Sequence, residues 1–278
     1  MKRRSLLLLL AGSGCHGPGG PALRLGSALV ELAARAAPGA EQQADQGLRE
    51  LERLRAVTER ELEANRGRSL SELLSELIFG RFGFVREVED TSLGFVLLPG
   101  VLERRRGSCV GLGTLFLALA EGLGGEASGI MRPGHFYVRA REAGGARNVE
   151  LLRRGEAMPD AWYAQRFPVP GGSAHEYGRP LSVSEVLGVV EYNVGNVRRR
   201  QLRLPESRAA FSRAVRLFPE LAEAHASLGA VEQLLGDLAA ARASYQRAQA
   251  VNPQLPGVAQ NLALLEAERT TALPTRSR

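Results

Sequence analysis

Apolar residues recur at helical spacing along the first part of the chain. Residues 22–37 are rich in alanine and leucine, and residues 42–65 combine regularly spaced leucines with dense charge. Residues 69–79 continue the pattern, and Ser69 followed three residues later by Glu72 matches a capping box. We therefore predict three helices in this region.

The apolar pattern is densest in the sequence GSCVGLGTLFLALAEGLG at residues 107–124. Ser108 is a suitable N-cap, the leucines that follow keep a helical period, and a glycine pair closes the run. The spacing predicts a buried helix whose first turn contains Cys109.

The pattern then changes from a helical period to alternation. Residues 135–139 alternate as a strand does, a glycine pair follows at 144–145, and residues 148–152 fit the paired strand. Residues 159–179 are rich in proline, glycine and aromatic residues, which predicts a loop or a lid.

From residue 181 onwards the chain is wholly helical in pattern and repeats itself. Residues 188–221 and 222–255 align at an offset of 34 residues, the length of a tetratricopeptide repeat. The positions that mark such repeats coincide in the two copies: Gly195 with Gly229, Phe211 with Tyr245, Ala214 with Ala248, and Pro219 with Pro253. We predict two tetratricopeptide repeats and a closing helix within 181–269; a plain helical hairpin bundle is the alternative.

The N-terminus has the features of an export signal. A basic start precedes a short apolar stretch at 5–11, and Gly-Ser-Gly then leads to Cys15. This order resembles a bacterial lipobox, although Gly12 stands where leucine is usual; an ordinary secretory signal is the alternative. We predict a signal over residues 1–15, lipidation of Cys15, a Gly/Pro tether at 16–21 and a periplasmic or cell-envelope lipoprotein, held at the membrane by its lipid alone.

Composition and charge exclude several classes of function. The net charge of +6 is almost entirely arginine, and loss of the signal would leave +3 without a basic patch, so we expect no nucleic-acid partner. No phosphate loop or dinucleotide fingerprint is present, and His16, His175 and His225 lack metal-ligand spacing. We therefore expect no cofactor and no metal.

The cysteine count directs attention to thiol chemistry. Cys15 and Cys109 are the only two cysteines, so lipidation of the first leaves Cys109 as the one thiol of an exported chain. A thiol nucleophile needs an imidazole within hydrogen-bond reach and a polar group that orients the imidazole. His135 supplies the first, and Glu150 or Asn148 on the neighbouring strand supplies the second.

Three blocks of sequence together resemble one family. RRRGSCVGLGTLFLALAEGLG, MRPGHFYVR and NVELLRRG are similar to the bacterial branch of the transglutaminase-like superfamily whose members often continue into tetratricopeptide repeats. The resemblance covers roughly residues 69–253 and implies a papain-like fold, with a Cys-bearing helix packed on an antiparallel sheet. We therefore predict an α+β transglutaminase-like domain with its N-terminal helices over residues 22–180, followed by the all-α repeats and a polar tail at 270–278.

The same resemblance implies a function. Cys109 would be the nucleophile and His135 the base. Glu150 stands where the superfamily usually has Asp, and Asn148 is the alternative third member. The expected activity is that of a cysteine protease, amidase or acyltransferase acting on a peptide or protein. A lipid-anchored scaffold that binds a protein partner through its repeats is the alternative; retention of both Cys109 and His135 favours the enzyme.

Overall fold

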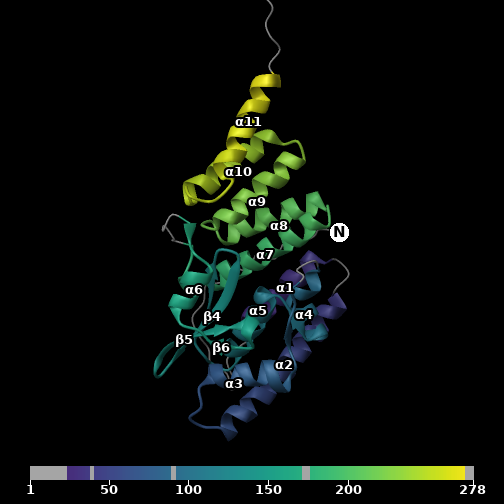
Figure 1. Cartoon of the computed structure of the whole chain (residues 1–278). Coiled ribbons are helices and arrows are strands. Elements are labelled where there is room, and N and C mark those ends of the chain that lie inside the picture. The colour runs from purple at the N-terminus through teal and green to yellow at the C-terminus, as the bar shows by residue number, and fades with distance from the viewer. Residues whose placement is uncertain (1–23, 38–40, 89–91, 171–175, 273–278) are drawn as a thin grey trace, which may run out of the picture.

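Helices surround one antiparallel sheet, and further helices extend away from it in a row (Figure 1). The structure is a computed structural model that describes residues 24–37, 41–88, 92–170 and 176–272. The predicted signal, the tether with His16, Cys15 and His175 lie outside these residues, as does most of the predicted tail. Among the helices that are described, none combines the length and the apolarity needed to cross a bilayer.

The predicted N-terminal helices are confirmed, with small shifts at their ends. Their bounds are α1 Arg24–Ala36, α2 Glu41–Ala64 and α3 Leu70–Glu76, which continues into a π-helical turn at Leu77–Arg81. Ser69 caps α3, since its hydroxyl accepts a hydrogen bond from the Glu72 amide at 3.2 Å. A short 3-10 turn, Leu93–Phe95, and α4, Leu98–Arg104, complete this helical layer.

The central helix of the fold is α5, Cys109–Gly122. Every residue from position 110 to position 120 is buried, because α1, α3 and α4 cover it on one side and the sheet covers it on the other. A helix that is apolar on all faces is stable only in such surroundings. Its start at Cys109 confirms the prediction from the sequence.

The sheet has four antiparallel strands in the order β3-β4-β5-β6, with bounds β3 Ala127–Arg132, β4 His135–Glu142, β5 Gly145–Glu150 and β6 Glu156–Ala157. Val138 pairs with Val149, and these two side chains face α5 together with Phe136. Tyr137 and Ile130 face the other side of the sheet. A separate parallel pair joins β1, Val85–Arg86, to β2, Arg106–Gly107.

The prediction of a loop throughout 159–179 is wrong in its first part, where Asp160–Arg166 forms α6. Pro159 precedes the helix with a φ of −71°, and Asp160 lies in the first turn, where a carboxylate is favourable. Tyr163 is completely buried against Ile130 and Tyr137. Packing of this aromatic side chain therefore stabilises a short helix, which the proline and glycine content of the segment did not predict.

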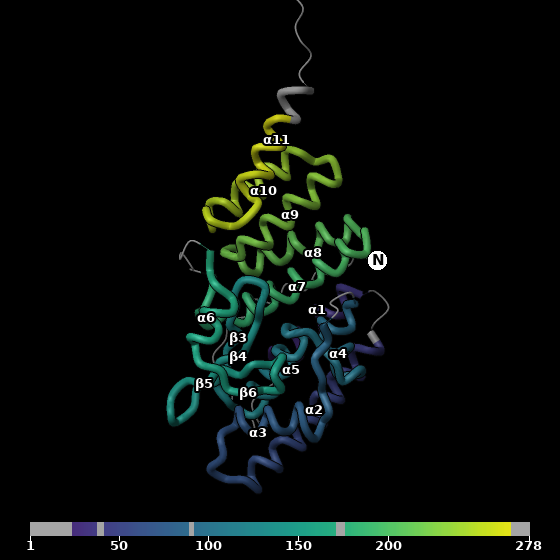
Figure 2. Tube along the Cα trace, viewed as in Figure 1, coloured from purple at the N-terminus to yellow at the C-terminus, as the bar shows by residue number. Residues whose placement is uncertain are grey.

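The C-terminal region is built of helical hairpins, which Figure 2 traces from the sheet to the end of the chain. Their bounds are α7 Val183–Arg200, α8 Leu204–Leu217, α9 Ala222–Leu234, α10 Leu238–Val251 and α11 Val258–Ala272. One contact recurs in both hairpins: a methyl group added at Gly195 would lie 2.5 Å from the Phe211 ring, and one added at Gly229 would lie 2.9 Å from the Tyr245 ring. Glycine is thus required at both helix crossings.

Candidate functional site

The start of α5 fixes the position of Cys109. Ser108 caps the helix, and its hydroxyl accepts a hydrogen bond from the Gly111 amide at 3.2 Å. Cys109 is the first helical residue and is partly exposed, while the residues on either side of it are buried. The first turn of a helix is a position where amide groups and the helix dipole favour negative charge.

The backbone around this start is closely packed. Arg105 ends α4 in the left-handed conformation at a φ of 52°, which turns the chain into β2 and towards the helix. The Ser108 amide then donates to the Phe95 carbonyl at 2.8 Å. A methyl group at Gly111 would lie 2.3 Å from that same carbonyl oxygen. Only glycine therefore allows the two segments to approach this closely.

His135 and Glu150 form a buried pair on neighbouring strands. The His135 Nε2 lies 2.8 Å from Glu150 Oε2, and the two residues are 5% and 1% exposed. The other carboxylate oxygen, Oε1, accepts the Leu152 amide at 3.0 Å. Engagement of Nε2 by the carboxylate leaves Nδ1 as the ring nitrogen available to a reacting group.

Asn148, the alternative third residue, lies on the same face of the sheet but has other partners. Its Oδ1 accepts the Arg139 Nε at 2.7 Å, and its Nδ2 donates to the Met158 carbonyl at 3.1 Å and to Asp160 Oδ1 at 2.9 Å. These bonds connect β4 and β5 to α6. The geometry favours Glu150 as the partner of the imidazole.

An aromatic layer from α6 covers the imidazole. The Phe167 ring stacks on the His135 ring with centroids 4.1 Å apart and planes 8° from parallel. Tyr163 stacks on Tyr137 at 3.7 Å, and burial together with the neighbouring Glu150 carboxylate raises the pKa of Tyr163, so that its phenol stays neutral. Trp162 contacts both Tyr163 and Phe167 edge-on.

The sequence indicated an aromatic segment here, but it did not assign Trp162, Tyr163 and Phe167 to the site. A signal for them exists: only 5% of the chain is aromatic, yet Trp162, Tyr163 and Phe167 fall within six consecutive positions. Such a local concentration of aromatic residues is typical of a segment that packs against a buried site.

Cys109, His135 and Glu150 line one pocket of about 540 Å³, together with Ser108, Gly134, Trp162 and Phe167. The structure thus brings the three predicted residues together around one opening, although they are spread over 42 positions of the chain. The thiol at a helix start, the imidazole at a strand start and the buried carboxylate are the groups that thiol-based acyl transfer needs.

Comparison with known families agrees with this architecture, since residues 45–168 match the family described as the transglutaminase-like superfamily. These residues form a transglutaminase-like domain. The domain contains Cys109, His135, Glu150 and the aromatic layer as far as Phe167. No curated protein matches the chain.

Among solved structures, one that matches is described as "Crystal structure of menin reveals the binding site for Mixed Lineage Leukemia (MLL) protein". The identity is 12%, the TM-score is 0.44, and the match covers 90% of this chain and 71% of that one.

A metal site would need carboxylates, or the remaining histidine of the described C-terminal helices, in a suitable geometry. No group of three histidine, cysteine, aspartate or glutamate side chains in the described residues is arranged to hold an ion. His225 is buried within α9, where its Nε2 lies 3.0 Å from the Pro219 carbonyl, and burial lowers its pKa. This histidine therefore has a structural partner.

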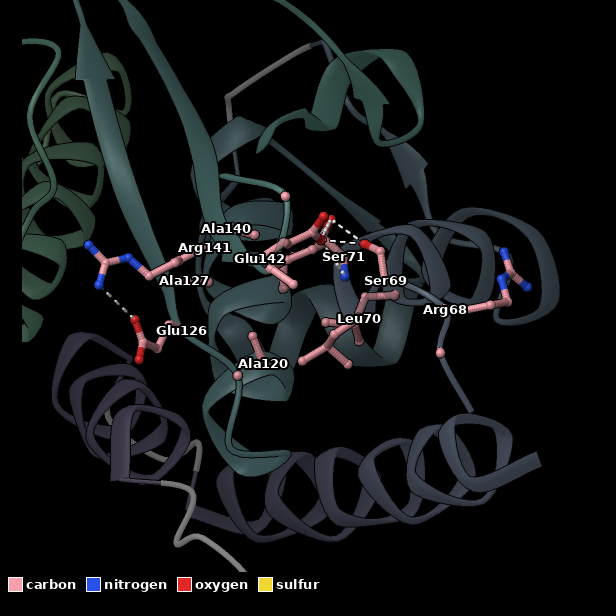
Figure 3. A pocket seen from close by; sticks show the side chains of 16 residues that line it. Arg68, Ser69, Leu70, Ser71, Ala120, Glu126, Ala127, Ala140, Arg141 and Glu142 are labelled. Carbon is pink, nitrogen blue, oxygen red and sulfur yellow. Dashed lines mark hydrogen bonds and ion pairs between the residues drawn. The ribbon is translucent and has the colours of Figure 1, made fainter. Parts of the chain in front are cut away.

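A second pocket, of about 340 Å³, opens between α3 and the ends of β3 and β4 (Figure 3). Its main polar group, Glu142, accepts hydrogen bonds from the hydroxyls of Ser69 and Ser71 and from the Ser71 amide. Although burial opposes the effect, these donors lower the pKa of Glu142. The carboxylate thus fastens β4 to the start of α3, and neither cysteine nor histidine is among the described residues that line this second pocket.

Proposed function

We propose that the transglutaminase-like domain is a cysteine hydrolase or acyltransferase acting on a peptide or amide, with Cys109 as nucleophile, His135 as base and Glu150 as the residue that orients the imidazole. The observation that supports it most strongly is the buried hydrogen bond between His135 and Glu150, 2.8 Å long, in the pocket that Cys109 also lines. Burying polar groups of this kind is costly unless they are hydrogen-bonded, and buried titratable pairs in a pocket are typical of functional sites.

The reaction would begin when the Cys109 thiolate attacks the carbonyl carbon and a C–S bond forms. The oxygen of the tetrahedral intermediate takes the negative charge, and the Cys109 backbone amide is a natural donor to it. The C–N bond then breaks, and His135 gives its proton to the departing amine. Water or a second amine, deprotonated by the same imidazole, attacks the thioester and releases the product and the thiol.

Glu150 and Phe167 would hold the imidazole for these steps. The carboxylate holds Nε2, and its other oxygen is fixed by the Leu152 amide. Phe167 lies parallel to the ring at 4.1 Å and so limits tilting of the imidazole. This pre-organisation keeps Nδ1 directed at the pocket throughout the cycle.

Trapping the acyl-enzyme tests the proposal. Incubation with p-nitrophenyl acetate should add one acetyl group to Cys109, identified by peptide mass spectrometry, and should release a burst of nitrophenol. Cys109→Ala should show neither. Equal acetylation of wild type and Cys109→Ala would refute the assignment of Cys109 as the nucleophile. So would the absence of acetylation in a wild-type protein whose thiol is shown to be reduced.

For the rest of the chain we propose a lipid-anchored envelope protein whose α7–α10 hairpins are two tetratricopeptide repeats. The support is the glycine-to-aromatic contact at equivalent positions of both hairpins and the lipobox-like sequence before Cys15. Mass spectrometry of the mature N-terminus should find an acylated Cys15; an unmodified N-terminal residue at another position would refute the anchor.

A further inference from the structure

Three arginines from three different elements border the pocket that contains Cys109. Arg86 ends β1, Arg153 ends the 3-10 turn Leu151–Arg153, and Arg166 lies in the last turn of α6. All three are exposed to solvent. A guanidinium group presents several donors in one plane, which matches the two oxygens of a carboxylate.

Each arginine is anchored close to a residue of the site. Arg86 pairs in register with Gly107, two positions before the nucleophile. Arg153 follows Glu150 by three positions, and Arg166 directly precedes Phe167, which stacks on the imidazole. The three arginine side chains therefore extend from backbone positions that are paired with, or close in sequence to, residues of the site.

The acidic side chains of the same pocket are already occupied by donors. Glu150 accepts from His135 and from the Leu152 amide. Glu87 pairs with Arg106 at 3.2 Å and accepts the Val88 amide at 2.8 Å. Among the described residues, both carboxylates that line the pocket thus already have side-chain and backbone partners.

The arginines, by contrast, retain donors. Arg86 makes no ion pair with the residues that the structure describes, and Arg166 lies over the Trp162 ring with its guanidinium carbon 5.8 Å from the centroid. Arg153 bonds Glu156 through Nε at 2.6 Å, which leaves its terminal nitrogens. Among the described residues that line the pocket, these arginines are thus the charged groups with donors to spare, and a carboxylate ligand would accept hydrogen bonds from them.

We infer that the substrate of this site is an acidic peptide, with a carboxylate side chain next to the amide that Cys109 attacks and with Arg86 and Arg166 as the residues that select it. The inference rests on the proposed function. The indole of Trp162 and the ring of Phe167 form an apolar wall for the neighbouring part of the peptide.

A set of matched peptidyl chloromethyl ketones tests the charge preference. The three reagents carry Glu, Gln or Lys next to the ketone and are otherwise identical; the Cys109 thiolate displaces chloride as a C–S bond forms. In low salt the alkylation rate of Cys109 should be about tenfold higher with Glu than with Lys, and the ratio should shrink in 0.5 M salt (roughly a 4 Å screening length) because the arginines are exposed.

Variants and a neutral reagent separate the possible failures. The double variant Arg86→Gln, Arg166→Gln should bring the Glu-to-Lys ratio to within about twofold of unity. The control variant is Arg141→Gln, which removes an exposed arginine outside this pocket, paired with Glu126 at 3.6 Å. It should leave the Glu-to-Lys rate ratio at its wild-type value. Iodoacetamide measures thiol reactivity alone: an unreactive thiol would refute the proposed function, whereas a reactive thiol with equal rates for the three ketones would overturn only the acidic-peptide inference.

Discussion

At the residue scale, the site depends on how Glu150 uses its two oxygens. One oxygen accepts from the imidazole and the other from a backbone amide, and the side chain is 1% exposed. Each carboxylate oxygen thus has a protein donor. A change that keeps the shape and removes the charge tests the role of this carboxylate without creating a cavity.

Glu150→Gln should lower the rate of Cys109 acetylation by about tenfold or more, because an amide holds the imidazolium less strongly than a carboxylate does. Asn148→Ala is the matched control on the same strand. Its hydrogen bonds go to Arg139, Met158 and Asp160, so it should cost about 1 kcal/mol of unfolding free energy and leave the acetylation rate nearly unchanged. The reverse order of the two rates would assign the orienting role to Asn148.

A second prediction at this scale concerns Glu142 and pH. Its pKa is lowered in the folded state, so its stabilisation is present above the unfolded value of 4.5 and is lost as the pH falls through the folded value. Glu142→Gln should lower the unfolding free energy at pH 7 by about 1 kcal/mol and should flatten its decline in acid. Urea titrations at pH 7 and at about pH 3 measure this; parallel losses in both proteins would contradict it.

The residues of the candidate site could be predicted because each lies in a local sequence pattern. Ser108 as an N-cap predicts the helix start beside Cys109, and the alternation of side chains predicts the strand that contains His135. The sequence favoured Glu150 through the resemblance and kept Asn148 as the alternative. Both lie on one face of β5, and only the contacts of Asn148 with Arg139 and Asp160 separate them. Such long-range partners leave no periodic trace in the sequence.

At the element scale, α5 tolerates little added volume where it faces the sheet. A methyl group at Gly113 would lie 2.5 Å from a carbon of the Phe136 ring, and both residues are buried. The Phe136 side chain also lies 2.4 Å from where a methyl group would be placed at Gly129. The ring is therefore enclosed by two glycines and cannot move aside.

Gly113→Ala should therefore destabilise the protein by about 1–3 kcal/mol, although alanine is the better helix former by about 1 kcal/mol. Gly80→Ala is the matched control, because a methyl group at Gly80 meets nothing within 4 Å. Thermal unfolding should show a lower midpoint for the first variant and an equal or higher one for the second. A neutral Gly113→Ala would mean that α5 and the sheet are less tightly packed than described.

The elements that the sequence did not reveal are those that depend on a partner. β3 contains Ala-Ser-Gly-Ile-Met-Arg, which hardly alternates, and it is a strand because it pairs with β4 at six positions. β6 has two residues, and α6 is stabilised by contacts of Tyr163. The helices α1, α2 and α5, which have their own amphipathic or apolar pattern, were predicted to within about two residues of their ends.

At the scale of the whole molecule, a short segment fastens the transglutaminase-like domain to the C-terminal helices. The Gly178 amide donates to the Met131 carbonyl of β3 at 2.9 Å. The neighbouring Glu176 accepts from Asn252 at 3.1 Å, and the Tyr177 hydroxyl donates to Glu223 of α9. These contacts tie α9 and the residue after α10 to the edge of the sheet at β3.

This connection should respond to pH. Burial raises the pKa of Glu223, so the folded state holds its proton more tightly than the unfolded chain and the unfolding free energy falls as the pH rises through the folded value. Glu223→Gln keeps an acceptor for Tyr177 and removes the charge. It should be more stable than wild type by about 1 kcal/mol at pH 7–8 and nearly equal to it near pH 4. An identical difference at both pH values would exclude titration of Glu223 as the cause.

The proposed function requires Cys109 and His135 to act as a pair, and the pH dependence of Cys109 alkylation by iodoacetamide reports on that pairing. Wild type should stay reactive at pH 6–7, well below the roughly 8.5 at which an ordinary thiol ionises. His135→Ala should lose that reactivity and regain part of it as the pH approaches about 8.5, and Glu150→Gln should lie in between. Equal pH profiles for wild type and His135→Ala would show that the two residues do not act as a pair.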